Sequence, residues 1–408
     1  MGGTLFLACL DVGTSKVSTT VAEVRQDSLE IIAVSTVPSQ GVRKGVVVDI
    51  ESTLGAIKTS VGRACEISGV EVKEVYVGIS DSHVRTIKST GAAIVANGMV
   101  NQHDVNDCLE NAQTIYLPLD KEVLHVIPLD YNVDGETEIN NPLGMKGTRL
   151  EANVQIVTVA TNSVHNLLKC CEMAGLSVAE LVYTPLVSSM AVLRDNEKNL
   201  GVFLVDIGGG TTDVAFFKDN RFAGAAVLEV AGNQFTNDLA VGLGVSLLEA
   251  EKIKKAYGMP GFPDDYEDEA ILIGVSGKGE QKVQKSFISS IIMDRSEELI
   301  GMISEEMRRL AGGETGHFRV VLTGGVSQMK GFESHVQALL NMPVRIGVPE
   351  GKDVIEKVQN PVFSTLLGLL YYGHKSMYEL SPVERLVGDL GSMKQWLKGL
   401  VGKFFRLN

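Results

Sequence analysis

Apolar and polar positions follow the same order twice along this chain. Near the N-terminus, three strand-like runs, LFLACL, KVSTTVAEV and LEIIAVSTV, precede residues 51–68, where apolar positions recur at helical spacing. From residue 201 the order starts again with GVFLVD, TDVAFFKDN and RFAGAAVLEV, followed by a helical stretch near 234–256. Three strands followed by a helix in both parts predict a duplicated α/β unit with two pseudo-symmetric halves.

Two segments interrupt this pattern. Residues 72–80 read as a buried strand, but residues 82–162 fit neither copy and are interpreted as an insertion. SGKGEQKVQKS, residues 276–286, is polar and contains glycine, so we expect a loop in a second insertion. A helical stretch near 364–380 is followed by Pro382 and a short polar linker.

The last eighteen residues, GSMKQWLKGLVGKFFRLN, combine an apolar stripe with four cations. They read either as a last core helix or as an amphipathic helix at a membrane surface. At roughly 1.5 Å per residue they reach only ~27 Å, which is too short to span a bilayer. Their position after a linker favours the membrane surface. The residues expected to contact lipids are Lys394, Trp396, Leu397, Lys398, Leu400, Lys403, Phe404, Phe405 and Arg406.

Net charge and cysteine content indicate the kind of partner and the cellular compartment. The 408-residue chain has a net charge of −13, and an acidic body disfavours nucleic acid as the main partner. The cationic end instead indicates an anionic target such as the lipid headgroups of an inner membrane. Five scattered cysteines predict buried thiols in a reducing cytoplasm. No signal peptide and no apolar run of eighteen residues is found, so we expect a peripheral protein.

The turn after the first strand of each half carries the candidate chemistry. The first turn reads DVGTSK from Asp11, and the second reads DIGGGTTD from Asp206. Glycines let backbone N–H groups approach an anion, and threonine and serine hydroxyls add donors. A single D-x-G-x-T match is also typical of an ordinary Asp-Gly turn. Two copies at corresponding points predict that both halves grip a polyphosphate.

Two further features support this site. Both carboxylates would face phosphates, which requires a divalent cation, so we expect Mg²⁺ held through water near Asp11 and Asp206, with Lys16 adding a positive charge. VVLTGGVSQM, residues 320–329, places Gly324 and Gly325 after a strand, where a base or ribose could lie against bare backbone. The alternative is a tight strand-to-helix turn.

These motifs resemble a known family. DVGTSK, DIGGGTTD and LTGG, in this order, are similar to the phosphate and adenosine motifs of the actin/heat-shock-chaperone/sugar-kinase superfamily. Within it the chain most resembles the bacterial cell-division FtsA family. The stretches that carry this resemblance are PSQGVRKGVVVDIE, HVIPLDYNVDG, NPLGMKGTRLEANVQIVT, VAGNQFTNDLA and PVRIGVP.

The resemblance implies an actin-like ATPase fold with a nucleotide cleft between the halves, plus a C-terminal amphipathic helix. The implied subdomains are IA (1–81, 163–200 and 360–380), inserted IC (82–162), IIA (201–243 and 319–359) and IIB (244–318), followed by a linker (381–390) and the helix (391–408). ATP with Mg²⁺ is the implied ligand. The implied nucleotide-binding residues are Asp11, Gly13, Thr14, Ser15, Lys16, Asp206, Gly208, Gly209, Gly210, Thr211, Thr212, Gly232, Asn233, Glu251, Lys254, Gly324 and Gly325.

The resemblance also implies partners. Family members bind the tail of the tubulin-like protein FtsZ, and Arg295 and Glu298 match positions tied to that contact; otherwise they form an ordinary surface pair. Glu251 and Lys254 would likewise be a salt-bridging helix face without the resemblance. Members polymerise head to tail through IC, which would also meet later division proteins. The expected protein therefore tethers FtsZ filaments of the Z ring to the cytoplasmic side of the cell membrane at the division site.

The sequence gives less information about catalysis than about nucleotide binding. Hydrolysis needs a positioned water and a base, and spacing assigns no catalytic residue. We therefore expect ATP binding with at most slow turnover. A kinase would need a catalytic aspartate, and only Asp195, in a polar stretch, is available. The alternative function is an actin-fold pilus-assembly or kinase-like ATPase. Asp81 stands where the family commonly has glycine, so the resemblance does not predict the backbone conformation between IA and IC at this point.

Overall fold

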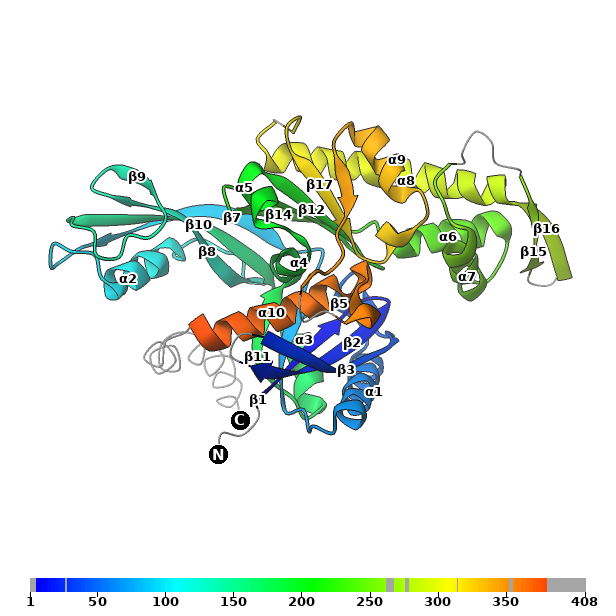
Figure 1. Cartoon of the computed structure of the whole chain (residues 1–408), viewed down its shortest axis with the longest axis horizontal. Coiled ribbons are helices and arrows are strands. Elements are labelled where there is room, and N and C mark those ends of the chain that lie inside the picture. Colours follow the sequence, from blue (N-terminus) through cyan, green and yellow to red (C-terminus); the bar gives the residue numbers. More distant parts are fainter. Residues whose placement is uncertain are drawn as a thin grey trace.

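The structure is a computed structural model that describes residues 5–25, 28–261, 268–275, 279–313, 315–351 and 355–379. The predicted linker, 381–390, and the predicted amphipathic helix, 391–408, lie outside the described residues. Within the described part, no helix is both long and apolar enough to cross a membrane. Figure 1 shows an elongated molecule with two central halves and a projection at each end.

Each half contains a five-stranded sheet, and the two sheets have the same internal order. The first sheet, in spatial order, is β11 (Ser177–Tyr183), β6 (Glu74–Ile79), β1 (Leu5–Val12), β2 (Lys16–Arg25) and β3 (Ser28–Pro38). The second, in the reverse direction, is β14 (Arg221–Leu228), β13 (Thr212–Lys218), β12 (Val202–Ile207), β17 (Arg319–Thr323) and β18 (Val344–Ile346). In chain order, the first three strands of each half pair antiparallel, as β1–β2–β3 and β12–β13–β14. The first strand of each set also pairs in parallel with a later strand, β1 with β6 and β12 with β17. The predicted duplication is confirmed.

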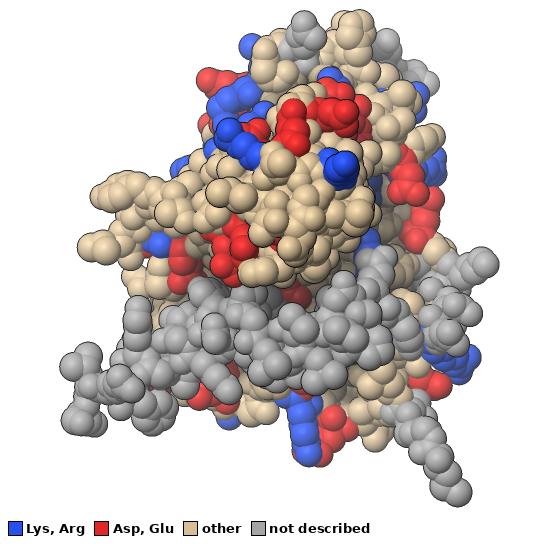
Figure 2. Space-filling model, turned by 90° about the vertical axis from the view of Figure 1, so that its left-hand side faces the viewer, with Lys and Arg blue, Asp and Glu red and all other residues tan. Residues whose placement is uncertain are grey.

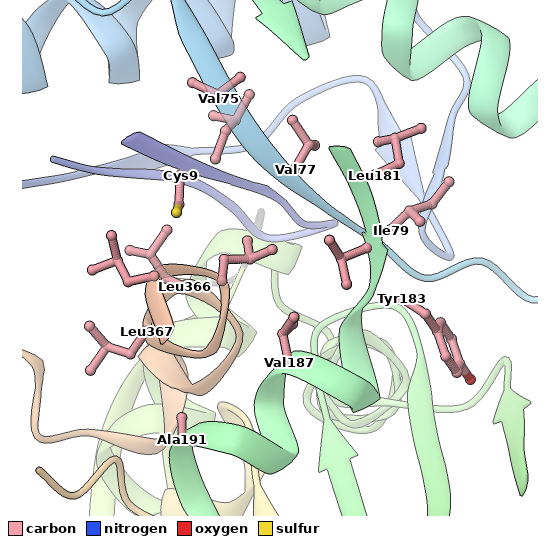
Figure 3. Close-up of a cluster of buried hydrophobic side chains, with 14 of the residues drawn as sticks. Cys9, Val75, Val77, Ile79, Leu181, Tyr183, Val187, Ala191, Leu366 and Leu367 are labelled. Carbon is pink, nitrogen blue, oxygen red and sulfur yellow. The ribbon is translucent and has the colours of Figure 1, made fainter. Parts of the chain in front are cut away.

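Helices cover both faces of the first sheet. α1 (Ile50–Ser68) and α3 (Thr161–Met173) pack together beside β3 and β11, and α4 (Thr184–Val192) and α10 (Ser364–Glu379) pack beside β1 and β6. Figure 3 shows Cys9 pointing from the sheet toward Leu366 of α10, with Val187 of α4 nearby. The same buried cluster continues into the second sheet through Ala215 and Phe217, so one apolar core joins the halves.

The second half has its own helices and an outer hairpin. They are α5 (Asp195–Leu200), α6 (Gly232–Leu243), α7 (Leu247–Tyr257), α8 (Lys285–Leu310), α9 (Phe332–Leu340), β15 (Ala270–Val275) and β16 (Gly279–Gln284). The short elements β4 (Val42–Arg43), β5 (Val46–Val47) and the 3₁₀ turns η1 (Val326–Gln328), η2 (Glu356–Val358) and η3 (Pro361–Phe363) complete the described chain.

Two local predictions differ from the structure here. The helical stretch near 234–256 is two helices, because Gly244 adopts a left-handed conformation (φ 66°) that ends α6. The loop predicted at 276–286 is wrong for the described residues 279–286, which form β16 and the start of α8. Pairing with the apolar strand β15 explains the difference, since an exposed hairpin strand can be almost entirely polar.

The insertion folds as a separate layer at one end of the molecule (Figure 1). Its sheet order is β7 (Arg85–Ile94), β10 (Arg149–Ala160), β8 (Lys121–Val133) and β9 (Glu136–Ile139), with α2 (Gln102–Ala112) packed on it. The hydroxyl of Thr86 donates to the carbonyl oxygen of Ala225 at 3.1 Å and accepts from the Ala225 N–H at 3.2 Å, which fastens the insertion to the edge strand β14. Figure 2 shows acidic and basic side chains interspersed on this end of the molecule.

Candidate functional site

A cavity of about 850 Å³ lies between the two halves. This volume is within the usual range for small-molecule sites. All the nucleotide-site residues predicted from the sequence line the cavity, with the exception of Thr212. The Thr212 side chain is fully buried and donates to the carbonyl oxygen of Val230 at 2.7 Å. Thr212 therefore does not line the cavity, because its hydroxyl joins β13 to the segment that follows β14.

The two phosphate-type turns have the same backbone geometry. The N–H of Gly13 donates to the carbonyl oxygen of Lys16 at 2.9 Å, and the N–H of Gly208 donates to the carbonyl oxygen of Thr211 at 3.0 Å. Each turn follows the first strand of its half and precedes the second. The two turns therefore occupy equivalent positions in the duplicated unit, as the repeated motif predicts.

The two turns also face each other closely. A Cβ atom added at Gly209 would lie 1.7 Å from Oγ of Ser15, and one added at Gly210 would lie 2.5 Å from Oγ1 of Thr14. Any side chain at either glycine would therefore force the turns apart. Thr14 is held in place because its Oγ1 accepts from the N–H of Gly45 at 3.1 Å. The glycines bring backbone and hydroxyl donors of both halves to one point.

Two other glycine segments complete this wall. The N–H groups of Gly232 and Asn233, at the start of α6, donate to the carbonyl oxygens of Gly208 and Gly209 at 3.0 Å and 2.8 Å. Gly324 has φ 82°, and a Cβ there would lie 2.4 Å from Oδ1 of Asp206. A side chain is therefore excluded at this position by both conformation and space.

Three carboxylates share the cavity wall. Burial raises the pKa of Asp11, although the nearby Lys16 opposes this shift. Burial and then the charge of Asp11 raise the pKa of Asp206 to about 6. Burial raises the pKa of Asp213 to about 8, against the effect of the Ser80 hydrogen bond. These carboxylates destabilise one another's charged forms, and a bound cation would relieve that repulsion.

The cavity can therefore accommodate a hydrated divalent cation. Mg²⁺ keeps several of its waters and is often held through one or two carboxylates, which suits Asp11 and Asp206. Among the described residues, no group of three or more histidine, cysteine, aspartate and glutamate side chains is arranged to hold a metal ion directly. Asp11 and Asp206 are the residues that would hold such an ion through water.

Lys16 has partners on both sides. Its ammonium group lies 4.0 Å from Oδ2 of Asp11, donates to the carbonyl oxygen of Val362, and lies 4.8 Å from the ring centroid of Phe363. Burial lowers the pKa of Lys16, and the charges of Asp11 and Asp206 oppose that shift. The sequence predicts Lys16 at a phosphate, but the contacts with the start of α10 are not visible from the motif.

Another part of the cavity wall is built on α6 and α7. The ammonium group of Lys254 lies 2.6 Å from Oε2 of Glu251 and donates to the carbonyl oxygen of Gly232 at 2.9 Å. It also donates to Oγ1 of Thr236 at 2.8 Å, and Thr236 donates to Glu251 at 2.5 Å. The pair therefore ties α7 to the start of α6, and both side chains line the cavity.

Several lining residues carry no sequence signal that singles them out. Ser80, Asp213, Gln328, Val362 and Thr365 come from four different parts of the chain. Asp213 ends the second turn motif, so its position in DIGGGTTD is the one available clue. The others reach the cavity through tertiary packing.

The remaining candidates lie outside the cavity. The guanidinium of Arg295 on α8 makes two hydrogen bonds to Asp238 on α6, at 2.5 Å and 3.0 Å, and also pairs with Glu298. The contact with Asp238 adds an anchor that the i, i+3 spacing does not indicate. Asp195 is an exposed residue at the start of α5 and does not line the cavity, so the structure offers no support for it as a kinase base.

Comparison with known proteins identifies the family of this chain. A model of "Cell division protein FtsA" matches residues 203–368, and a model of "SHS2 domain inserted in FTSA" matches residues 81–158. FtsA of Pseudomonas aeruginosa is 38% identical over 403 residues, which covers 96% of this chain and 97% of that protein. The chain belongs to the FtsA family. Other FtsA proteins agree: that of Escherichia coli K12 is 32% identical over 96% of this chain and 95% of its own length.

Solved structures show the same fold at low identity. The structure of the PilM–PilN type IV pilus biogenesis complex has a TM-score of 0.66 and 17% identity, covering 91% of this chain and 99% of that chain. MreB 5 of Spiroplasma citri bound to AMPPNP has a TM-score of 0.56 and 14% identity, covering 93% and 99%. The actin-like fold is confirmed. Full-length similarity to FtsA proteins favours the cell-division family over the pilus-assembly alternative.

Proposed function

We propose that this FtsA family member binds ATP with Mg²⁺ between its halves, polymerises on the inner face of the cytoplasmic membrane and tethers FtsZ filaments there. The observation that carries the ATP part is the convergence of two equivalent glycine turns, a glycine pair and the start of α6 on one cavity. The bound AMPPNP in the MreB 5 structure, which shares the fold, supports the same ligand class. In this proposal residues 82–162 meet the neighbouring subunit and later division proteins.

The two turns would receive the phosphates. Backbone N–H groups and the hydroxyls of Thr14, Ser15 and Thr211 supply donors without adding charge. Asp11 and Asp206 would hold Mg²⁺ through water, and the ion would supply the positive charge that lets polyphosphate approach two carboxylates. The ribose and base would lie toward Glu251, Lys254 and Gly325, which form another part of the cavity wall.

Slow turnover is the expected behaviour. Asp213 ends the second turn motif, and burial raises its pKa to about 8 when no cation is bound. A protonated carboxyl group that already has a hydrogen-bond partner, Ser80, is a poor general base. The protein therefore uses ATP mainly as a ligand that organises the two halves. Such a role suits an assembly protein.

In this proposal two surfaces connect FtsZ to the membrane, one for the FtsZ tail and one for lipid. Arg295, fixed by Asp238, and Glu298 would receive the FtsZ tail peptide on α8. The amphipathic residues 391–408 would lie in the membrane interface with their four cations toward anionic headgroups, each contributing about 1 kcal/mol. A single such anchor binds weakly and reversibly, so a filament presenting many anchors gains through avidity.

Liposome co-sedimentation tests the proposal. FtsZ filaments should sediment with anionic vesicles only when the intact protein and ATP are both present. Deletion of residues 391–408 should abolish that recruitment while leaving ATP affinity within twofold. Recruitment by the truncated protein, or equal recruitment to vesicles of neutral lipids, would rule out the membrane tether. Absence of ATP binding to the intact chain in calorimetry would rule out the nucleotide site separately.

A further inference from the structure

The first turn of α10 is part of the cavity wall. Pro361, Val362 and Thr365 line the cavity, although they lie about 350 residues from the first phosphate-type turn. α10 begins at Ser364 and continues to Glu379, where the described chain ends before the predicted linker. η3 and α10 therefore begin at the proposed nucleotide site, and α10 ends just before the predicted linker.

Lys16 makes the first connection between the phosphate turns and this helix. Its ammonium group donates to the carbonyl oxygen of Val362 and lies over the ring of Phe363 at 4.8 Å. Phe363 does not itself line the cavity, but its ring contacts Lys16, which does. The position of residues 361–363 and the position of Lys16 therefore depend on each other.

Asp206 makes a second, independent connection. The hydroxyl of Ser188 on α4 donates to Oδ2 of Asp206 at 3.3 Å and lies 3.0 Å from Oγ1 of Thr365 on α10. A third hydroxyl contact, between Thr323 and Ser364 at 2.6 Å, joins the end of β17 to the same helix turn. The first turn thus reaches η3 through Lys16, and the second reaches α10 through Ser188.

α10 is packed so that a displacement at one end reaches the other. A Cβ added at Gly368 would lie 1.9 Å from the carbonyl oxygen of Val187, so α10 and α4 touch backbone to backbone. Gly373 packs on Leu7 less closely, and an added Cβ there would lie 3.0 Å from the leucine side chain. The sixteen-residue helix spans ~24 Å at roughly 1.5 Å per residue. Shifts of whole helices in switching proteins are typically about 1–2 Å.

We propose that Lys16, through η3, and Asp206, through Ser188, couple the bound nucleotide to the position of α10, and that the end of α10 carries this state to the start of the predicted linker. Phosphate oxygens form stronger, charge-assisted hydrogen bonds with an ammonium group than a neutral carbonyl does. Nucleotide would draw Lys16 away from Val362, and Mg²⁺ beside Asp206 would alter the Ser188–Thr365 contact. η3 and the first turn of α10 would then lose or change their contacts together, and α10 would shift. This inference rests on the proposed binding of ATP.

Hydrogen exchange of the α10 amides tests this coupling without lipids. The intact protein is measured at a concentration at which sedimentation shows a monomer, with and without ATP and Mg²⁺. We expect exchange at residues 370–379 to change at least fivefold on binding. Phe363→Leu and Ser188→Ala should each reduce this response toward none, while calorimetry shows ATP affinity within threefold of the original protein.

Matched variants separate coupling from packing. Phe363→Tyr keeps an aromatic ring beneath Lys16 and should retain the full response. Tyr371→Phe changes the same helix at a hydroxyl that donates to the carbonyl oxygen of Glu350, away from the cavity, and should also respond fully. Fluorescence of Trp396, the single tryptophan, then reports vesicle binding of the monomer, whose ATP dependence should disappear in Phe363→Leu.

Two results would overturn the inference. One is ATP binding, measured by calorimetry, without any change of exchange in α10. The other is an unchanged response in both Phe363→Leu and Ser188→Ala. Failure of ATP to bind the intact protein would be recognised in the calorimetry itself and would remove the proposed nucleotide site together with this coupling.

Discussion

Ser80 and Asp213 connect the two halves across the cavity. The hydroxyl of Ser80, directly after β6, donates a 2.5 Å hydrogen bond to Oδ1 of Asp213 on β13. Asp213 is only 6% exposed, and both residues line the cavity. The contact places a buried, titratable group where the halves meet, so the stability of this junction depends on pH.

Asp213 predicts a specific pH dependence. Its pKa is raised from 3.8 to about 8, so between those values the folded protein holds a proton that the unfolded chain has released. Stability therefore falls as pH rises through this window, by up to ~1.4 kcal/mol per pH unit. In urea titrations from pH 5 to 8, the original protein should lose stability relative to Asp213→Asn. A constant difference between the two proteins would contradict the shifted pKa. Glu136→Gln, at an exposed position of β9, is the control.

ATP binding should require a residue without a side chain at position 210, where the two phosphate turns meet. Gly210→Ala places a Cβ 2.5 Å from Oγ1 of Thr14, so the turns must separate. We expect ATP affinity to fall at least tenfold in calorimetry. Gly301→Ala is the control, because a Cβ in that position of α8 meets open space and should raise stability by ~1 kcal/mol. Normal ATP affinity in Gly210→Ala would show that the close approach of the turns is not needed for binding.

Replacing Arg295 should weaken binding of the FtsZ tail peptide. Arg295→Ala removes the cation that Asp238 and Glu298 hold on α8, and an FtsZ tail peptide should bind at least tenfold more weakly in fluorescence anisotropy. Arg309→Ala removes a second arginine of α8, one paired with Glu306, and should leave peptide binding unchanged. ATP affinity should be unaffected in both. Equal peptide binding by Arg295→Ala would remove this residue from the proposed surface.

The terminal cations predict how strongly membrane binding depends on charge. Each should contribute about 1 kcal/mol, so Lys398→Gln with Lys403→Gln should weaken binding to anionic vesicles by about 30-fold. The blue shift of Trp396 emission on vesicles provides the measurement. Lys73→Gln, a charge change on the body of the protein, is the control. A double variant that binds as tightly as the original protein would mean that the cations do not face headgroups.

Much of the fold could be predicted because its signals are local and occur twice. The apolar alternation of β1 to β3 and of β12 to β14 identifies strands, and Asp11 and Asp206 mark the turns that follow the first strand of each set. Helical spacing and an acidic cap similarly locate α1, where Asp49 accepts from the N–H of Ser52. Repetition is what distinguishes the turns from ordinary Asp-Gly turns.

The parts that could not be predicted depend on contacts between distant residues. Lys16 meets Val362 across 346 positions of sequence, and Ser80 meets Asp213 across 133. Arg295 finds Asp238 on another helix, and the polar residues of β16 become a strand because β15 lies beside them. None of these residues has a spacing or a motif that names its partner.

The sequence by itself therefore determined the first three strands and the helical stretch that follows them in each half, the turns between those strands, and which turns have the chemistry to meet phosphate. Tertiary structure alone decided that Thr212 faces the β13–β14 contact, that Asp213 is buried against Ser80, and that α10 starts beside Lys16. The physical reason is that hydrophobic periodicity fixes which face of an element is buried but not what it packs against. The partner is selected only when both sheets close on the shared core around α4 and α10.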